Sequence, residues 1–293
     1  MASELDQAGT AVEHAPTASE YIQHHLHHFT SGEQKGIFDL SVVNIDTLIW
    51  SIGIGVFFST LLFLAARRAT SGVPGRFQAL VEMVVEMVED QSKSIVHGNR
   101  TFIAPLAMTV FVWVFLMNSL DFLPVDLFEH LFELFGIHAE YFRPVPTADL
   151  NGTFGISFGI LLLMLFYSIK IKGIAGWGHE LFTAPFGTSK NPVFAVILGF
   201  FNFAMQLIEF VAKTVSLAMR LFGNMYAGEL LFMLIALMGA AWTGWNFTSI
   251  ALGGAHIIAG SLWAIFHILI VLLQAFIFMM LTLVYLGQAH ESH

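Results

Sequence analysis

The chain has 293 residues, of which 56% are hydrophobic and only 11% are charged. Soluble domains average about 25% charged residues, so this composition excludes a soluble globule, a disordered protein and a coiled coil. The net charge of −9 repels phosphate backbones and argues against a nucleic-acid partner. The absence of cysteine excludes disulfides, zinc–thiolate sites and thiol catalysis. The composition therefore predicts an all-α polytopic membrane protein.

Apolar runs long enough to cross a bilayer, about 20 residues each, recur five times along the chain. They cover residues 48–66, 102–120, about 154–169, 192–242 and about 251–286. The polar, acidic residues 1–44 contain no apolar core of a signal peptide, so we expect a polar N-terminal segment and one membrane domain over 45–293. Residues 77–96 have one apolar and one acidic face, which predicts an amphipathic helix on the membrane surface or one packed on a neighbouring helix.

Basic residues indicate the orientation of these runs, because short loops rich in Lys and Arg stay on the cytoplasmic side. They gather in the first and third segments between runs, whereas the second segment holds Arg143 alone among six acids. Five crossings therefore place the N-terminus outside and the C-terminus in the cytoplasm. The run 192–242 is ambiguous, because about 50 helical residues span roughly 75 Å, more than twice a hydrocarbon core of about 30 Å. It is either one strongly tilted helix or two crossings, and two crossings would move the C-terminus outside.

A polar stripe follows the fourth run. At 100° per residue, seven polar side chains fall within an arc of about 80°, and they are Asn202, Gln206, Glu209, Lys213, Ser216, Arg220 and Asn224. Glu229 lies about 180° from Arg220 on the same helix, so it must serve a different contact. In the last run, His256, Gly260, His267 and Gln274 form a second polar face, which we expect to meet the first face or a partner that both share.

Arg220 is the most informative residue of the stripe. An arginine at the bilayer centre costs about 2.5–3.5 kcal/mol on insertion scales, and its guanidinium cannot lose the proton. Arg220 therefore needs water or a carboxylate, either in a structural ion pair with Glu209 or Glu229 or in an ion or proton pathway. His267 is either a histidine that donates to a neighbouring carbonyl or a proton relay beside Glu229, because imidazole titrates near neutral pH. Gln274 is more typical of a hydrogen bond between helices.

Several motifs resemble those of one known family. The most specific is RLFGNMYAGE at residues 220–229, followed by WAIFHILI at 263–270 with QAFIF at 274–278. The others are YIQHHL at 21–26, SGVPG at 71–75, FVWVFLMN at 111–118, PVPTAD at 144–149 and YSIK at 167–170. Together they resemble the a subunit of the F-type ATP synthase membrane sector, of the proteobacterial type, over nearly the whole chain.

The resemblance implies a proton-conducting stator subunit of the bacterial inner membrane, with a periplasmic N-terminus and no cofactor or catalysis of its own. It implies a ring of c subunits and the b subunits of the peripheral stalk as partners, in contact with membrane lipid. Protons would enter through an outer half-channel, neutralise a ring carboxylate, travel with the ring and leave through an inner half-channel, with Arg220 between the two. The family also has long, tilted last helices, which favours one helix over 192–242, a second over about 251–288 and a cytoplasmic C-terminus.

The resemblance assigns the remaining site residues to one half-channel or the other. Four residues match the outer half-channel region of the family: Glu229, His267, Gln274 and Asn224. Three more lie toward the outer mouth of that half-channel: Asp149, Asn151 and Asp126. Some relatives carry a glutamate where this chain has Gln206, whereas here the acid is Glu209, about one turn along on the same face. We therefore expect Glu209 and Ser216 to line the inner half-channel.

Two other classes of function compete with this interpretation. A secondary transporter or ion channel with an intramembrane Arg/Glu/His site would usually show internal repeats, and the two halves of this chain differ in charge and helix length. A membrane metal oxidase needs several His clusters, and the sequence has one, His24-His25-Leu26-His27-His28. A solvated or helix-capping segment is the stronger interpretation of that cluster. His267 favours protons over sodium as the transported ion.

Overall fold

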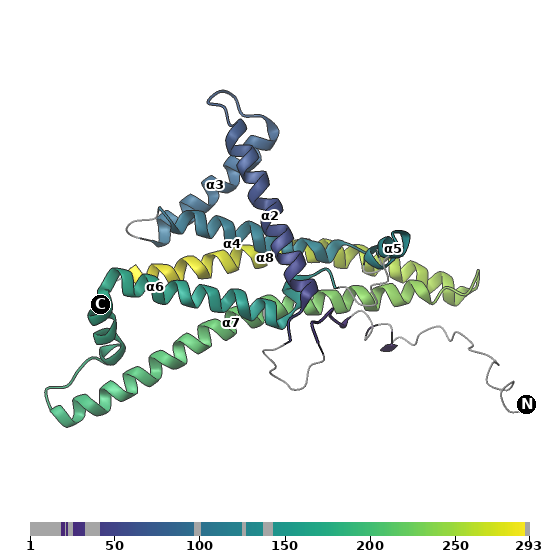
Figure 1. Cartoon of the computed structure of the whole chain (residues 1–293). Coiled ribbons are helices and arrows are strands. Elements are labelled where there is room, and N and C mark those ends of the chain that lie inside the picture. The colour runs from purple at the N-terminus through teal and green to yellow at the C-terminus, as the bar shows by residue number, and fades with distance from the viewer. Residues whose placement is uncertain are drawn as a thin grey trace, which may run out of the picture.

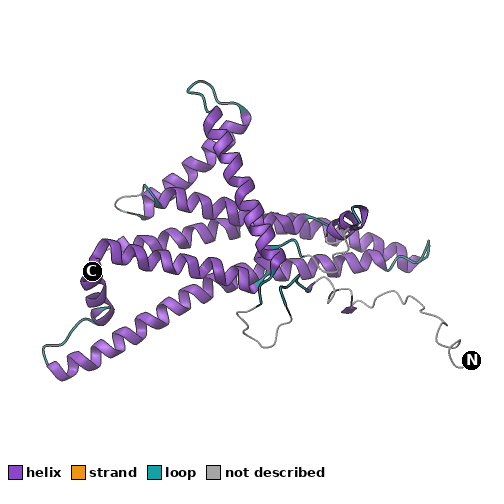
Figure 2. Cartoon of the chain, viewed as in Figure 1, coloured by secondary structure: helices purple, strands orange, loops and turns teal. Residues whose placement is uncertain are grey.

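The structure is a computed structural model that describes residues 19–20, 22, 26–32, 42–96, 101–124, 127–136 and 143–290. In these parts of the chain the regular elements are helices (Figure 2), apart from an isolated bridge between Thr30 and Asn44. Five of the described helices are long and apolar enough to cross a membrane. The predicted all-α polytopic membrane fold is therefore confirmed.

Helices α2 (Ile45–Arg68), α3 (Arg76–Ile95) and α4 (Ile103–Ser119) lie at the sides of a triangle in Figure 1. Helix α2 rises from the centre of the molecule to the loop at the top of Figure 1, and α3 returns from it. Arg67 and Arg68 close α2, where cations favour the negative end of the helix dipole. Helix α4 then runs back through the bundle and ends in the short 3₁₀ turn η1 (Leu120–Phe122).

Helix α3 occupies the segment for which the sequence predicts an amphipathic helix. Its Val88 is buried, and Val84 and Met87 pack against the core that α4 and α8 share. Phe77 and Leu80, from the same apolar face, are exposed. The helix therefore packs on its neighbours through one part of its apolar face, and another part is left uncovered.

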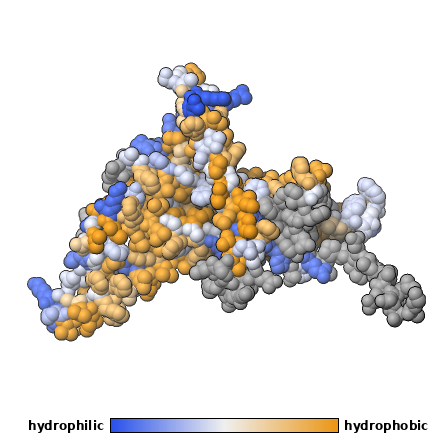
Figure 3. All heavy atoms as spheres, in the orientation of Figure 1, coloured by the Kyte–Doolittle hydropathy of each residue, from blue (hydrophilic) through white to orange (hydrophobic). Residues whose placement is uncertain are grey.

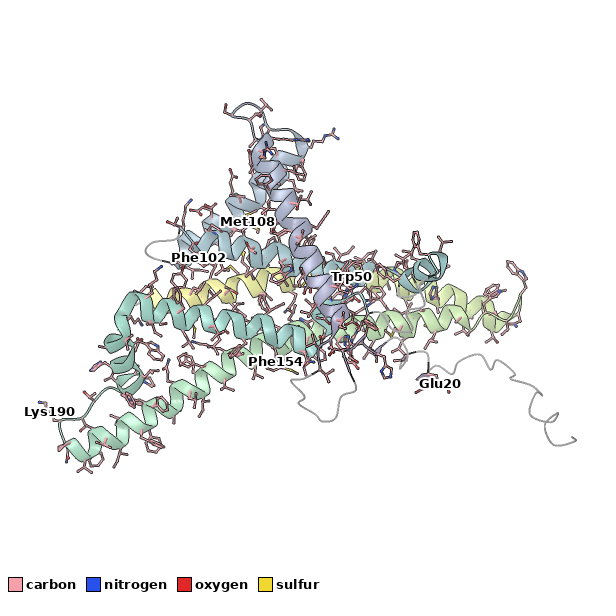
Figure 4. All side chains as sticks on the ribbon, in the orientation of Figure 1. Glu20, Trp50, Phe102, Met108, Phe154 and Lys190 are labelled. Atoms are coloured by element: carbon pink, nitrogen blue, oxygen red, sulfur yellow. The ribbon has the colours of Figure 1, made fainter. Side chains whose placement is uncertain are left out.

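Two short elements and a long helix follow. They are α5 (Leu127–Leu134), the 3₁₀ turn η2 (Pro146–Ala148) and α6 (Leu150–Thr183). Trp50 of α2, labelled in Figure 4, lies where α2 crosses the bundle, and its ring is 4.9 Å from that of Phe128 in α5.

Helix α6 is longer than the apolar run that predicts it, because Lys170 and Lys172 do not end it. It continues through a break at Gly173, whose φ of 73° is a left-handed value that favours glycine. Lys172 Nζ lies 2.7 Å from both carboxylate oxygens of Glu180 and joins the two sides of the break. The bend at the left end of α6 in Figure 1 follows from this glycine.

Helix α7 (Pro192–Ala240) settles the ambiguity of residues 192–242, because it is one helix of 49 residues. Asn191 caps it by accepting a hydrogen bond from the backbone nitrogen of Val193, and Pro192 occupies the first turn, where no backbone donor is needed. Its length is about 74 Å at 1.5 Å per residue. Helix α8 (Phe247–His290) returns beside it and is slightly longer at both ends than the predicted 251–288.

The core lies between α4 and the C-terminal half of α8, with contributions from α6 and α7. Val114 and Met117 of α4, Phe278 and Leu283 of α8, and Leu221 of α7 are fully buried there. Elsewhere large apolar side chains are exposed, above all along α2 and the first half of α7. Figure 3 shows hydrophobic residues over much of this face, and hydrophilic ones at the top loop and the α6–α7 turn. Such a surface suits lipid rather than water.

Candidate functional site

Arg220 lies in the middle of α7 with a half-buried side chain. The two acids considered as its counter-ion pair instead with other cations, Glu229 with Arg143 and Glu209 with Lys213. Among the residues that the structure describes, no carboxylate pairs with Arg220. The adjoining positions on this side of α7, Ser216, Gly223 and Asn224, are exposed. The guanidinium therefore stands at the edge of an uncovered helix face, without an ion pair inside the described chain.

Glu209 and Lys213 form an ion pair of 2.6 Å across one turn of α7. Lys213 Nζ also donates to Oε1 of Gln288 at 2.8 Å and lies 5.3 Å from the centre of the Tyr285 ring, which ties α7 to the end of α8. Glu209 is exposed, as is Ser216 two turns further along. Both face the same side of α7 as Arg220, as the periodicity predicts.

Glu229 is held by Arg143, a residue that the sequence analysis used only to judge orientation. The guanidinium Nε donates to both carboxylate oxygens at 3.0 Å, and Nη2 makes a further short contact with Oε2. Both side chains are buried. Burial alone would lower the pKa of Arg143, but the Glu229 carboxylate raises it above its ordinary value, so the guanidinium stays charged. Tyr226 lies beside it, with its ring centre 5.6 Å away.

Further contacts link the Arg143–Glu229 ion pair to the segment that precedes α2. Arg143 Nη1 lies 3.0 Å from Nε2 of His28, and Nδ1 of His28 lies 3.1 Å from Oδ2 of Asp46. The backbone nitrogens of Arg143 and Phe29 also donate to Asp46. Four charged or titratable side chains from four parts of the chain thus form one line, from Asp46 through His28 and Arg143 to Glu229.

His267 does not contact Glu229 and instead faces Asp121 of η1. Its Nε2 lies 2.6 Å from Oδ2 of the carboxylate, and both side chains are buried. The ring nitrogens are not aligned for hydrogen bonds, so this is a close contact between imidazole and carboxylate without hydrogen-bond geometry. Gly228 makes the approach possible, because a Cβ there would overlap Cε1 of His267. The structure therefore places Asp121, rather than Glu229, against the imidazole of His267, because Gly228 on α7 has no side chain in the way. The relay role of His267 stays a prediction.

The two predicted polar faces meet at Asn224 and Gln274, whose side chains are joined by a hydrogen bond of 2.7 Å from Nδ2 to Oε1. Gln274 is buried, whereas Asn224 is exposed. Nearer the α7–α8 turn, Nδ1 of His256 lies 2.7 Å from the carbonyl oxygen of Ile235. Asn224 and Gln274 thus connect α7 to α8 one turn away from Arg220.

Asp149 caps the start of α6. Its Oδ1 accepts from the backbone nitrogen of Asn151, and its Oδ2 accepts from Asn44 Nδ2 and Thr47 Oγ1, each at 2.9 Å. It therefore fixes α6 to α2, and only the exposed Asn151 side chain is open to water. Asp126, predicted beside these two residues, lies outside the described residues.

Asn202 has a structural position at the other end of the polar stripe. Its Nδ2 donates to the carbonyl oxygens of Phe182 and Gly187, and its Oδ1 accepts from the backbone nitrogen of Phe186. The side chain thereby holds the loop between α6 and α7. Membership of the polar stripe does not by itself identify a pathway residue. Of the His cluster near the N-terminus, His24 and His25 lie outside the described residues, and the described ones contain no group that could hold a metal ion.

Comparison with known proteins identifies the family. Residues 48–287 match the family model described as ATP synthase A chain. The chain is 64% identical over 283 residues to ATP synthase subunit a of Acidovorax sp. (strain JS42), which covers 96% of this chain and 98% of that protein. It belongs to the family of F-type ATP synthase a subunits. A second a subunit, from Paracidovorax citrulli (strain AAC00-1), is 61% identical to this chain, and the match covers 96% of this chain and 98% of that protein. The a subunit of Chromobacterium violaceum is 49% identical, and the match covers 95% of this chain and 100% of that protein.

Membership of the family confirms the resemblance found in the sequence. As an F-type a subunit, the chain is a multi-pass protein of the bacterial inner membrane that serves proton transport and ATP synthesis. The a subunit brings together three site residues that sequence reasoning missed, Arg143, Asp121 and Asp46. The available signal was the isolation of Arg143 as the one basic residue in an acidic segment.

Proposed function

We propose that this a subunit conducts protons along the stator side of a rotating c ring, with Arg220 between two half-channels. The observation that carries the proposal is an arginine on an exposed face of α7 that lacks a carboxylate partner among the described residues. A charge that cannot be neutralised and that costs about 2.5–3.5 kcal/mol at the bilayer centre needs a counter-ion. Carboxylates carried past it by the ring would supply one in turn.

The chemistry of this step is electrostatic. A nearby cation lowers the pKa of a carboxyl group by about 1–3, so a ring carboxylate releases its proton as it reaches Arg220. The same fixed positive charge repels a free proton and prevents a direct leak between the half-channels. This step moves protons and converts no substrate, so we infer a non-catalytic subunit of the complex.

The two half-channels lie on opposite sides of Arg220 along α7. Asn224 and Glu229 follow it by about 6 and 14 Å of helix rise, and with Gln274 and His267 of α8 they form the outer half-channel. Asp149, Asn151 and Asp126 belong to its mouth. Glu209 precedes Arg220 by about 17 Å and forms the inner half-channel with Ser216.

The orientation follows from charge. Arg67 and Arg68 end α2, Lys170 and Lys172 lie just before the break of α6 at Gly173, and Lys190 lies just before the start of α7. Basic ends stay in the cytoplasm, so the N-terminus is periplasmic and the C-terminus cytoplasmic. The b subunits of the stalk and membrane lipid complete the surroundings of the chain.

A cross-linking experiment tests the contact with the ring. The chain contains no cysteine, so a single Ser216→Cys can be labelled in the purified complex with a photoreactive benzophenone maleimide. We expect a product that contains a and c subunits. The matched control is Ile52→Cys on α2, which is 60% exposed and lies on another helix. Labelled Ser216→Cys that never captures a c subunit, or equal capture by both variants, would contradict the proposal.

A further inference from the structure

His28 occupies a position that the proposed mechanism does not use. Its side chain is only 17% exposed, and it lies between Asp46 at the start of α2 and Arg143. Arg143 in turn holds the carboxylate of Glu229. Only Arg143 therefore separates His28 from Glu229, a residue of the proposed outer half-channel, although His28 comes from the segment before the first membrane helix.

The two partners of His28 determine its tautomer. A guanidinium only donates hydrogen bonds, so Nε2 of His28 must accept from Nη1 of Arg143 at 3.0 Å. An ionised carboxylate only accepts, so Nδ1 must carry the proton that points to Oδ2 of Asp46 at 3.1 Å. Only a neutral imidazole with its proton on Nδ1 satisfies both contacts.

Protonation removes one of these contacts. An imidazolium carries a proton on each ring nitrogen, so Nε2 would turn an N–H toward an N–H of Arg143, while the contact to Asp46 would survive. Nη1 of the buried Arg143 would lose its hydrogen-bond acceptor. The guanidinium would then no longer be fixed by His28 in its orientation toward Glu229. Other titratable groups also face this cluster. Asp149 at the start of α6 and Tyr226 of α7 interact electrostatically with Arg143, and Asp121 of η1 interacts with both Arg143 and Glu229.

We propose that His28 is a positioning residue that orients Arg143 against Glu229 while it is neutral and releases that hold when it is protonated from the outer side. His28 thereby makes proton entry sensitive to the pH outside the membrane. The inference rests on the proposed function, because it assumes that Glu229 belongs to the outer half-channel.

Two substitutions imitate the two states. His28→Gln offers an amide oxygen to Arg143 and does not titrate, and His28→Lys carries a permanent positive charge. His27→Gln is the matched control, because His27 is the exposed neighbour in the same segment. The complexes are reconstituted into liposomes, and ATP synthesis is measured while the pH on the outer side is varied. The pH difference and the membrane potential are kept constant.

The ratio of each variant to the native complex is the readout. We expect His28→Gln to match the native rate at pH 8 and to exceed it by about threefold at pH 5, the effect of one positioning hydrogen bond. His28→Lys should be slower by about threefold at pH 8 and converge on the native rate at pH 5. His27→Gln should follow the native complex throughout.

Ratios for His28→Gln that do not change with outer pH would overturn the inference, since a purely structural role gives a constant ratio. The His28→Gln profile decides the matter even if His28→Lys fails to assemble. Arg220→Ala in the same liposomes separates the two proposals. If that variant synthesises ATP, the proposed function fails. If it is inactive and the His28 ratios are flat, only the role of His28 fails.

Discussion

Arg143 and Glu229 are 86 positions apart in the sequence and form a buried ion pair in which the guanidinium Nε reaches both carboxylate oxygens at 3.0 Å. Glu229 therefore has a counter-charge within its own chain, whereas Arg220, nine residues earlier on α7, has no such partner among the described residues. The two arginines therefore differ in their surroundings. Arg143 compensates a fixed acid inside the subunit, and Arg220 is left available for an acid from outside it.

Arg143→Ala should reduce ATP-driven proton pumping strongly, because it leaves Glu229 buried without a counter-charge. Removing one partner of a buried pair typically costs about 3–5 kcal/mol, and a carboxyl group in that position holds its proton rather than passing it on. Pumping is measured by the acidification of inverted membrane vesicles, and the amount of a subunit by immunoblot.

The double variant Arg143→Gln with Glu229→Gln is the control for assembly in this experiment. It removes both charges, so no buried charge is left without a partner. The amount of this subunit in the membrane should therefore equal that of the native subunit, while pumping stays low. Native pumping by Arg143→Ala would show that the ion pair has no part in proton entry.

The helices could be predicted from the sequence because their signals are local. The apolar runs predict the five long helices, and the period of 3.6 residues places Ser216 and Arg220 on one exposed face of α7. The end of α6 could not be predicted in this way. Lys170 and Lys172 interrupt the apolar run, yet a helix that extends beyond the membrane can carry such charges, and the break comes only at Gly173.

The meeting of the two polar faces at Asn224 and Gln274 was expected from the helical period. The partners of Glu229 and His267 could not be predicted, because they lie in segments that share no period with α7 or α8. Arg143 lies in an irregular stretch before η2, and nothing in its spacing indicates Glu229. Asp121 reaches His267 only because Gly228 leaves room between them, which depends on the packing of three elements. The composition of the segment around Arg143 was the one usable signal, since a lone cation among acids suggests a structural counter-ion.

Arg220→Ala should abolish ATP-driven pumping while the complex still assembles. The neutral side chain can no longer keep a passing ring carboxylate ionised, and it is not needed to compensate an acid of the described chain. Arg220→Lys should also be severely impaired, because an ammonium is a more strongly hydrated point charge than a guanidinium. Co-purification of the c and b subunits checks assembly. Substantial pumping by either variant would remove the basis for placing Arg220 between the half-channels.

Gly228→Ala tests the contact between His267 and Asp121 without changing a polar group. The added Cβ overlaps Cε1 of His267 and comes within 3.0 Å of a carboxylate oxygen of Asp121, so one of the two side chains must move. We expect pumping to fall several-fold, with an overpacking cost of about 1–3 kcal/mol. Gly155→Ala on α6 is the control, because a Cβ there meets nothing within 4 Å. Equal pumping by the two alanine variants would indicate that the position of His267 does not matter for conduction.

Glu209→Gln should slow ATP-driven pumping if the carboxylate lines the inner half-channel. The loss of its ion pair with Lys213 is a small structural change, because an exposed pair one turn apart contributes only about 0.3–0.5 kcal/mol, and the Glu209 side chain is 49% exposed. Lys213→Gln breaks the same ion pair but keeps the acid, so it separates the two effects. A slow Glu209→Gln beside a near-native Lys213→Gln assigns the effect to the carboxylate. Equal slowing of both variants would assign it to the ion pair, and native rates for Glu209→Gln would mean that protons reach the ring by another inner route.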